Sequence, residues 1–378
     1  MRILTAGESH GEYLTAIIEG FPKGVTIRQE LINGELSRRR SGFGRGKRME
    51  IEADRIHIVS GLRNKVTLGS PIAMLVRNRD TRIFTDKADG QAMLSVPRPA
   101  HADLSGALKY HEHDVRNILE RASARETVMR VCVGAACKQF LGIFGIALAS
   151  YTVRVGSIVS SQKPKGVFDV VGRTRTSKLN CIDRIREERM IKEIERAQHK
   201  HDSLGGVAEI LIEGVCPGLG SVMHYDKRLD GRLAAALMSV PAAKGVEVGL
   251  GFDYAAGRGA HSHDCICYNP KKGFFHTTNN SGGIEGGMST GAPIIVRLAM
   301  KPIATLTRPL DSVNLITKRK EKAIVERTDT CAIAAFGVIA ENMCAIILTE
   351  AFLEKFGCDT LSEIKRNYRA YIKSIQAF

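Results

Sequence analysis

The feature that most constrains the fold is an internal repetition. Three pairs of segments match in the same order along the chain: IIEGFPKG from Ile17 with LIEGVCPG from Leu211, GSPIAMLV from Gly69 with GAPIIVRL from Gly291, and ILERAS from Ile118 with IVERTD from Ile324. Their shared order, at separations of about 200 residues, indicates a tandem duplication. We therefore expect two pseudo-symmetric halves, with a ligand site at the seam to which both halves contribute.

The predicted fold class is α+β. Short β-branched runs alternate with helical segments such as 122–140 and 331–356, without the regular order of a doubly wound sheet. We expect one globular catalytic domain over residues 1–378, an internally duplicated β-α-β sandwich-like body. The pseudo-repeats are approximately 1–150 and 204–378. A divergent charged segment, 151–203, joins them, and the apolar spacing within 183–201 predicts an amphipathic surface helix.

Composition narrows the class of protein. With 44% hydrophobic and 25% charged residues, the 378-residue chain is typical of a soluble globular protein. No apolar run approaches the roughly 20 residues of a membrane helix, and no targeting pattern opens the sequence. We therefore expect a cytoplasmic protein without membrane contact. Nine cysteines, an odd number without framework spacing, are expected to be reduced thiols.

A net charge of +15 is expected to attract anions. Arginines crowd into RRRSGFGRGKR, residues 38–48, where glycines let the backbone approach a ligand closely. This segment suits a small-anion site or a nucleic-acid contact, with a solvated basic surface as the alternative. Because tryptophan is absent and aromatic residues are only 6%, there is little on which bases could stack, and the small anion is favoured.

The run GESHG, from Gly7 to Gly11, permits two interpretations. Ser9 could be a nucleophile on a strained strand-to-helix turn, or His10 could be an acid–base group. A nucleophile elbow normally follows several strands, and only six residues precede this run, so His10 is favoured.

A second histidine, His101, lies in a comparable turn. Arg98 could bind an anion there, and Asp103 could adjust the imidazole. For His10 and His101 alike, the alternative is a histidine that satisfies backbone groups of its turn.

Three further motifs could carry chemistry. Arg121 and Arg125, four residues apart around Ser123, suit phosphate from one helix face, or else form ion pairs with Glu120 or Glu126. The Gly-rich run 279–291 precedes a strand and matches neither the Walker nor the dinucleotide pattern, so it is a ligand loop or a hairpin turn. On a strand, the side chains of HSHDCIC, residues 261–267, would spread over roughly 20 Å and could not share one zinc ion. No metal site is expected.

Along nearly its whole length the chain resembles the chorismate synthase family. The motifs TAGESHG, RRRSGFGRGKRMEIE, RPAHADLSGALKY, LERASARET, DGRLAAALMSVPAAKGVE, NNSGGIEGGMSTG, MKPIATL and ERTDTCA occur in that family's order, and 151–203 is the least diagnostic part. The resemblance implies a lyase of the shikimate pathway, at the last common step to aromatic amino acids. It eliminates phosphate (anti, 1,4) from 5-enolpyruvylshikimate 3-phosphate to give chorismate.

The resemblance also implies a cofactor and partners. Reduced FMN (FMNH2) would be required without net redox change, and NADPH would act only indirectly, through a separate flavin reductase. The protein would be a homotetramer that binds a small anionic substrate.

Specific residues acquire roles from the resemblance. His10 would protonate the departing phosphate, His101 would protonate or hydrogen-bond the reduced flavin, and Asp329 would relay the ring proton of the substrate, acting through the flavin. The substrate-binding residues would be Ser9, Arg39, Arg45, Arg48, Arg98, Arg125 and Arg327. The cofactor-binding residues would be Arg121, Ala122, Ser123, Pro241, Ala242, Gly286, Lys301, Pro302, Ile303, Ala304, Thr305 and Arg327.

Three positions depart from many family members: Ala100 replaces Gly, Pro241 replaces Asn and Thr328 replaces His. Ala100 would be strained if its φ were positive, and Pro241 has no N–H to donate. Two other functions stay open. A flavin- or nicotinamide-dependent oxidoreductase would consume reductant with turnover, whereas a nucleic-acid-binding protein would show steep salt dependence of affinity.

Overall fold

The computed structural model describes residues 1–46, 51–81, 93–270, 273–326 and 328–378. Its helices are α1 (Gln29–Arg40), α3 (Asp103–Tyr110), α4 (Arg116–Ala122), α5 (Thr127–Gly142), α6 (Val167–Thr174), α7 (Arg184–His199), α8 (Leu229–Met238), α9 (Asp253–Ala256), α10 (Gly259–Ser262), α11 (Ile333–Phe356) and α12 (Leu361–Gln376). Its strands are β1 (Arg2–Ala6), β2 (Tyr13–Glu19), β3 (Ile56–Ile58), β4 (Leu62–Arg63), β5 (Val66–Thr67), β6 (Ile72–Arg77), β7 (Ala147–Val155), β8 (Ile158–Val159), β9 (Gly206–Glu213), β10 (Ala243–Val248), β11 (Ile266–Asn269), β12 (Gly273–His276), β13 (Ile284–Glu285), β14 (Met288–Ser289), β15 (Ile294–Met300), β16 (Asp311–Val313) and β17 (Lys320–Lys322).

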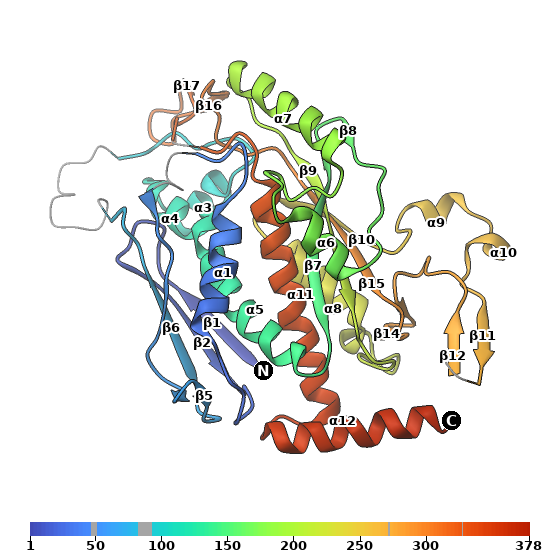
Figure 1. Cartoon of the computed structure of the whole chain (residues 1–378). Helices are drawn as coiled ribbons and strands as arrows, with labels where there is room; N and C mark the ends of the chain where they lie inside the picture. The colour runs from blue at the N-terminus through green and yellow to red at the C-terminus, as the bar shows by residue number, and fades with distance from the viewer. Residues whose placement is uncertain (47–50, 82–92, 271–272, 327) are drawn as a thin grey trace.

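Two antiparallel sheets enclose a layer of helices. Within the described residues, one sheet has the strand order β1-β2-β6-β3 and the other has the order β10-β15-β9-β7-β8. Helix α5 packs on β2 and β6, α11 packs on β7 and β9, and the two helices pack on each other (Figure 1). The molecule is therefore a mixed helix-and-sheet structure, and the predicted α+β class is confirmed.

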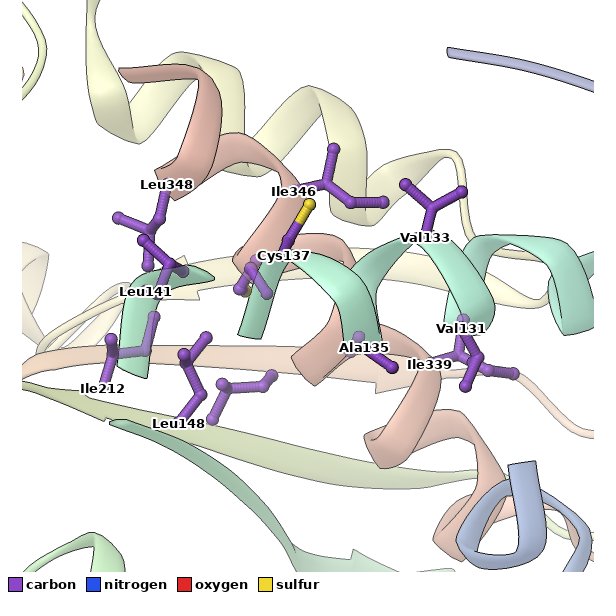
Figure 2. Packing of buried hydrophobic residues seen from close by; sticks show 14 of the residues in the cluster. Val131, Val133, Ala135, Cys137, Leu141, Leu148, Ile212, Ile339, Ile346 and Leu348 are labelled. Atoms are coloured by element: carbon purple, nitrogen blue, oxygen red, sulfur yellow. The ribbon is translucent and has the colours of Figure 1, made fainter. Parts of the chain in front are cut away.

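The contact between α5 and α11 forms the centre of the core. Aliphatic residues of both helices interlock there, including Val131 and Ile339, and Leu148 and Ile212 approach from the second sheet (Figure 2). Gly134 permits the close crossing, because a Cβ at this position would lie 2.5 Å from atoms of Asn342. Helix α5 is buried almost all round, as expected for a helix covered on both faces.

Helix α11 corrects one expectation from the sequence. By length and composition its 24 residues could cross a membrane, contrary to the expectation that no apolar run reaches that length. In the fold, 83% of its most apolar window is buried inside the protein. Its apolar surface faces α5 and the second sheet, which is the position of a core helix.

Other predicted elements can be checked directly. The helix expected within 183–201 is present as α7, and Asp183 caps it by accepting a hydrogen bond from Arg186 N. Residues 261–267 do not form one continuous strand, the geometry on which the argument against a shared zinc ion was based. Residues 259–262 form the short helix α10, held by a hydrogen bond from Asn280 Nδ2 to the Ser262 carbonyl, and β11 begins only at Ile266. All nine cysteines are free thiols.

Candidate active site

A cavity of about 420 Å³ opens between the two halves of the chain. Residues of the turn after β1, the loop before α3 and the end of α4 form one side. The loop after α8, the segment after β15 and the first half of α11 form the other. Residues from both parts of the chain, 1–150 and 204–378, therefore line one cavity.

His10 is held by a buried carboxylate. Its backbone N–H donates to Glu120 Oε2 at 2.7 Å, and its Nδ1 lies 2.8 Å from Glu120 Oε1. Because an ionised carboxylate only accepts, Nδ1 carries the proton and Nε2 is left to exchange one. Asp80 Oδ2 lies 4.0 Å from Nε2. This double contact fixes both the position and the tautomer of the imidazole.

His101 is supported in a similar way. Its Nδ1 lies 2.5 Å from Asp103 Oδ1, and the other oxygen of Asp103 accepts from Arg98 Nε at 2.8 Å. Burial alone would raise the pKa of Asp103, but the hydrogen bonds from His101 and Arg98 outweigh burial and hold that pKa well below its usual range. Arg98 also donates to Thr305 Oγ1 at 2.8 Å, joining the two halves.

Three arginines from different elements approach one wall of the cavity: Arg39, Arg45 and Arg125. Arg125 is clamped by Asp54 Oδ1 at 2.7 Å and by Asn78 Oδ1 at 2.9 Å, so its guanidinium cannot swing away. Arg45 Nε lies 3.4 Å from Asp329 Oδ2.

The other oxygen of Asp329 accepts a hydrogen bond from Gly46 N at 2.6 Å, which places this carboxylate from the second half beside the arginine segment of the first.

The crowding of positive charge affects the pKa of Arg39. Its burial, together with the nearby charges of Arg125 and Arg45, lowers the pKa of Arg39 to about 10, although Asp54 acts in the opposite direction. Within the described residues, Arg39 NH1 has no hydrogen-bond partner, and its ion-pair partner Asp54 Oδ2 lies 3.8 Å away. A bound anion would supply the missing acceptor and offset the crowded positive charge, so this wall suits an anion.

Part of the lining is apolar. Leu119 of α4 and Ala335, Phe336 and Ile339 of α11 contribute to it, together with Lys301, Ile303, Ala304 and Thr305 of the segment after β15. Such a surface, apolar with polar groups beside it, suits a flat aromatic ligand.

The two alanines at the rim have left-handed backbones, with φ of 60° at Ala100 and 72° at Ala242. The strain anticipated for Ala100 is therefore present.

Most of the predicted site residues meet at the cavity. Its lining includes Ser9, His10, Arg39, Arg45, Arg98, His101, Ala122, Ser123, Arg125, Pro241, Ala242, Lys301, Ile303, Ala304, Thr305, Thr328 and Asp329.

Three predicted cofactor ligands lie outside that lining. Arg121 donates to the carbonyl oxygens of Thr5 and Gly7, Pro302 is exposed, and Gly286 lies in the β13–β14 turn. Arg48 and Arg327 lie outside the described residues.

Local structure corrects two interpretations of the motifs. The turn 7–12 connects strand β1 to strand β2 rather than a strand to a helix, so it is not a hydrolase elbow. Arg121 and Arg125 do not share a helix, because α4 ends at Ala122 and Ser123 is extended, with ψ of 139°. Arg125 belongs to a separate 3-10 turn, where its N–H donates to Ser123 Oγ.

The residues that hold the site were largely missed from the sequence. The sequence predicts a role for Asp103 because this residue is close to His101 in the chain. Glu120 was considered only as a surface partner for arginine, yet it is 2% exposed and bound to His10. Glu52 ends the motif RRRSGFGRGKRMEIE without a role assigned from it, and Asp54 and Asn78 belong to no motif; all three reach Arg125 only through tertiary packing.

Comparison with known proteins agrees with this geometry. The family model described as chorismate synthase matches residues 1–353. Chorismate synthase of Symbiobacterium thermophilum is 48% identical over 389 residues, with 99% of each chain covered. That of Desulforudis audaxviator is 48% identical over 385 residues, covering 100% of this chain and 98% of its own. A solved structure, "Crystal Structure of Chorismate Synthase", covers 100% of this chain and 98% of its own at 40% identity, with a TM-score of 0.83. The chain therefore belongs to the chorismate synthase family.

Proposed function

We propose that the protein is a carbon–oxygen lyase that converts 5-enolpyruvylshikimate 3-phosphate to chorismate by anti 1,4-elimination of phosphate. The observation that carries the proposal is the crowding of Arg39, Arg45 and Arg125 at one cavity, where the pKa of Arg39 is lowered by burial and by the neighbouring arginines although Asp54 acts in the opposite direction. The substrate carries one phosphate and two carboxylates, and guanidinium forks bind such groups in fixed orientations. Two histidines backed by carboxylates line the same cavity.

The reaction breaks one C–O bond to phosphate and one C–H bond, and it forms a new ring double bond. His10 Nε2 donates a proton to the departing phosphate oxygen, which leaves poorly as a full dianion. Glu120 favours this step because it stabilises the protonated imidazole through Nδ1. Asp329, beside Arg45, is the carboxylate available to take up the proton lost from the ring carbon.

The described residues fit a flavin. Its ring system requires an apolar surface edged by hydrogen-bonding groups, and the lining contributed by α11 and the segment 301–305 has both properties. His101, fixed by Asp103, would hydrogen-bond the ring edge. Lys301 and Ser123 would contact polar parts of the cofactor. Reduced FMN, when bound, supplies electron density to the reacting ring without net oxidation.

An anaerobic assay tests the proposal. Purified protein, substrate and chemically reduced FMN should give chorismate and phosphate in equal amounts, with many turnovers per flavin and none with oxidised FMN. His10→Ala should lose turnover and retain flavin binding, whereas His57→Ala, an exposed histidine of β3, should not. Consumption of reductant with each turnover would instead establish an oxidoreductase.

We propose further that the protein is a cytoplasmic homotetramer and depends on a separate flavin reductase that uses NADPH. Light scattering tests the assembly. Turnover with NADPH and FMN alone would contradict the requirement for a reductase.

We also propose that the two halves arose by duplication, as single-domain pseudo-repeats. The matched segments fall on corresponding elements, β2 with β9 and β6 with β15, and the third pair precedes α5 and α11. Superposing the halves by this correspondence tests the proposal, which fails if α5 does not then overlie α11.

A further inference from the structure

A second cavity lies on the four-stranded sheet, outside the candidate active site. It has a volume of about 690 Å³ and is lined by Glu12, Ala53, Arg55, Arg77, Asn78, Arg79 and Thr81. We call Arg55, Arg77 and Arg79 the arginine triad. The proposed reaction assigns no role to these residues, and none of them belongs to the motifs that suggested the function.

The strand pairing brings the triad to one face. Ile56 of β3 pairs with Val76 of β6, so the antiparallel register places Arg55 opposite Arg77. Along β6, Met74, Val76 and Asn78 are buried, whereas Arg77 and Arg79 are exposed. Side chains alternate across a strand, and the three guanidiniums therefore share the outer face of the sheet at its end.

This arrangement is electrostatically unfavourable without a ligand. Like charges directly opposite each other on paired strands destabilise a sheet. Within the described residues, no carboxylate forms an ion pair with any member of the triad, although Glu12 lines the same cavity. Three arginines that line one cavity supply donors from which a phosphate group can accept hydrogen bonds.

The cavity adjoins the machinery of the active site. Asn78 lines it and accepts a hydrogen bond from Arg125 Nε of the first cavity. The backbone N–H of Arg79 donates to Glu52 Oε2, the atom that also contacts Arg125 NH2 at 3.3 Å. A ligand on the triad is therefore separated from the anion-binding wall by the side chains of Asn78 and Glu52.

We propose that the arginine triad is a second anion site, which binds inorganic phosphate or the phosphate group of a small phosphomonoester. The concave shape favours a small ligand over a nucleic acid, since no aromatic side chain lines the cavity for base stacking. The inference goes beyond the proposed elimination, and its test requires neither turnover nor flavin.

The experiment is calorimetric titration of the whole protein with inorganic phosphate and, separately, with glycerol 3-phosphate. Arg77→Gln and Arg79→Gln should each weaken one binding event about tenfold or more, the loss expected for one charge-assisted hydrogen bond. Arg63→Gln in β4 is the matched control, an exposed arginine that does not line the cavity, and it should bind as the wild type does. Stronger binding of one of the two ligands identifies the natural source of the phosphate.

A second measurement locates the anion. Crystals soaked in tungstate should show the heavy atom among the three guanidiniums. The triad variants should also be at least as stable as the wild type in phosphate-free buffer, because removing one charge relieves repulsion. Equal phosphate binding by Arg77→Gln and Arg63→Gln would overturn the proposal. So would dissociation of an oligomer by Arg77→Gln with no tungstate at the triad, because the arginines would then serve a protein interface.

Discussion

At the scale of single residues, the contact between Glu120 and His10 is the most informative. Glu120→Gln keeps the size of the side chain but removes the charge that stabilises a protonated imidazole, and it lets Nδ1 accept instead of donate. We expect kcat to fall by roughly 10²–10⁴, the usual contribution of a general acid, with flavin binding retained. Steady-state kinetics from pH 6 to pH 9 measure the fall in kcat and any shift in its pH profile.

The matched control is Glu126→Gln. This neighbouring carboxylate, in the 3-10 turn before α5, pairs with Arg130 of α5. The kcat of Glu126→Gln should stay near that of the wild type. Equal rates for the two variants would exclude a role of Glu120 in orienting His10.

Ala100 permits a test of backbone strain. Its φ of 60° belongs to the left-handed region, which costs an L-residue roughly 1–2 kcal/mol. Ala100→Gly should therefore raise the free energy of unfolding by about 0.5–1 kcal/mol, since part of the gain is offset by the greater entropy of glycine in the unfolded chain. Urea unfolding measures the change.

Ala102 is the control for this substitution. It has an ordinary helical backbone, with φ of −72°. Ala102→Gly should lower stability, and a gain at this position as large as that at Ala100 would contradict the strain argument.

At the scale of elements, the buried carboxylate of Glu341 joins α11 to three other elements. Glu341 of α11 is fully buried and binds Arg38 of α1 at 2.9 Å, Lys138 of α5, and Ser150 N of β7 at 2.8 Å. Burial alone would raise the pKa of Glu341, but Arg38 and Lys138 outweigh burial and hold that pKa well below its usual range. The charge is thus satisfied by cations on both neighbouring helices.

Glu341→Gln should lower the free energy of unfolding by about 1.5–3 kcal/mol, because it removes the buried charge that accepts hydrogen bonds from Arg38 and Lys138 and leaves these cations only Glu35. Glu350→Gln, which removes a more exposed partner of Arg232, should cost less than about 1 kcal/mol. Denaturant titration at pH 7 compares the two variants, and equal losses would contradict the structure.

The same group predicts a pH dependence. A carboxylate whose pKa is depressed by folding stabilises the native state above its unfolded pKa, about 4.3 for Glu. That contribution is lost as the pH falls through the depressed native value. We therefore expect the wild type to lose stability below about pH 4, and Glu341→Gln to lose less over the same range. Unfolding midpoints of the wild type and Glu341→Gln, measured from pH 3 to pH 7, test this difference. Parallel curves for the two proteins would contradict it.

The sequence predicted elements well where a local pattern determined them. The spacing of apolar residues was sufficient for α7, because one face of that helix contacts the protein and the other faces solvent. The departure of 261–267 from a continuous strand was not predictable, because its short helix depends on a distant loop: Asn280 binds Ser262, and Asp264 accepts hydrogen bonds from Asn280 and Ser281. No local periodicity reports such contacts.

At the scale of the whole molecule, the thiols report on the integrity of the core. Cys265 and Cys358 are exposed, and Cys267 is partly so. The other six are buried, and burial raises the pKa of Cys331 and of Cys216 to about 11. Ellman's reagent should label the exposed pair first and the six buried thiols only on unfolding. Rapid labelling of more than three native thiols would contradict the packing.

For the molecule as a whole, residue types and motif order were sufficient to predict a basic cavity suited to anions, lined from both parts of the chain. His10, His101 and the arginines have side chains whose chemistry is legible in a sequence. Their supports were not predictable, because Glu52, Asp54 and Glu120 act only after distant segments have packed. The membrane-like length of α11 was also misjudged, since local composition does not distinguish a core helix from a spanning one.

The position of α11 in the chain affects how this protein is made. The helix begins at Ile333, yet it covers the second sheet and supports α5 from within. At about 5–20 residues per second, a ribosome spends tens of seconds on the preceding chain. Until α11 is made, the inner face of the second sheet and one face of α5 lack their cover, and this protein should therefore need a chaperone more than proteins of equal size whose central helix is translated early.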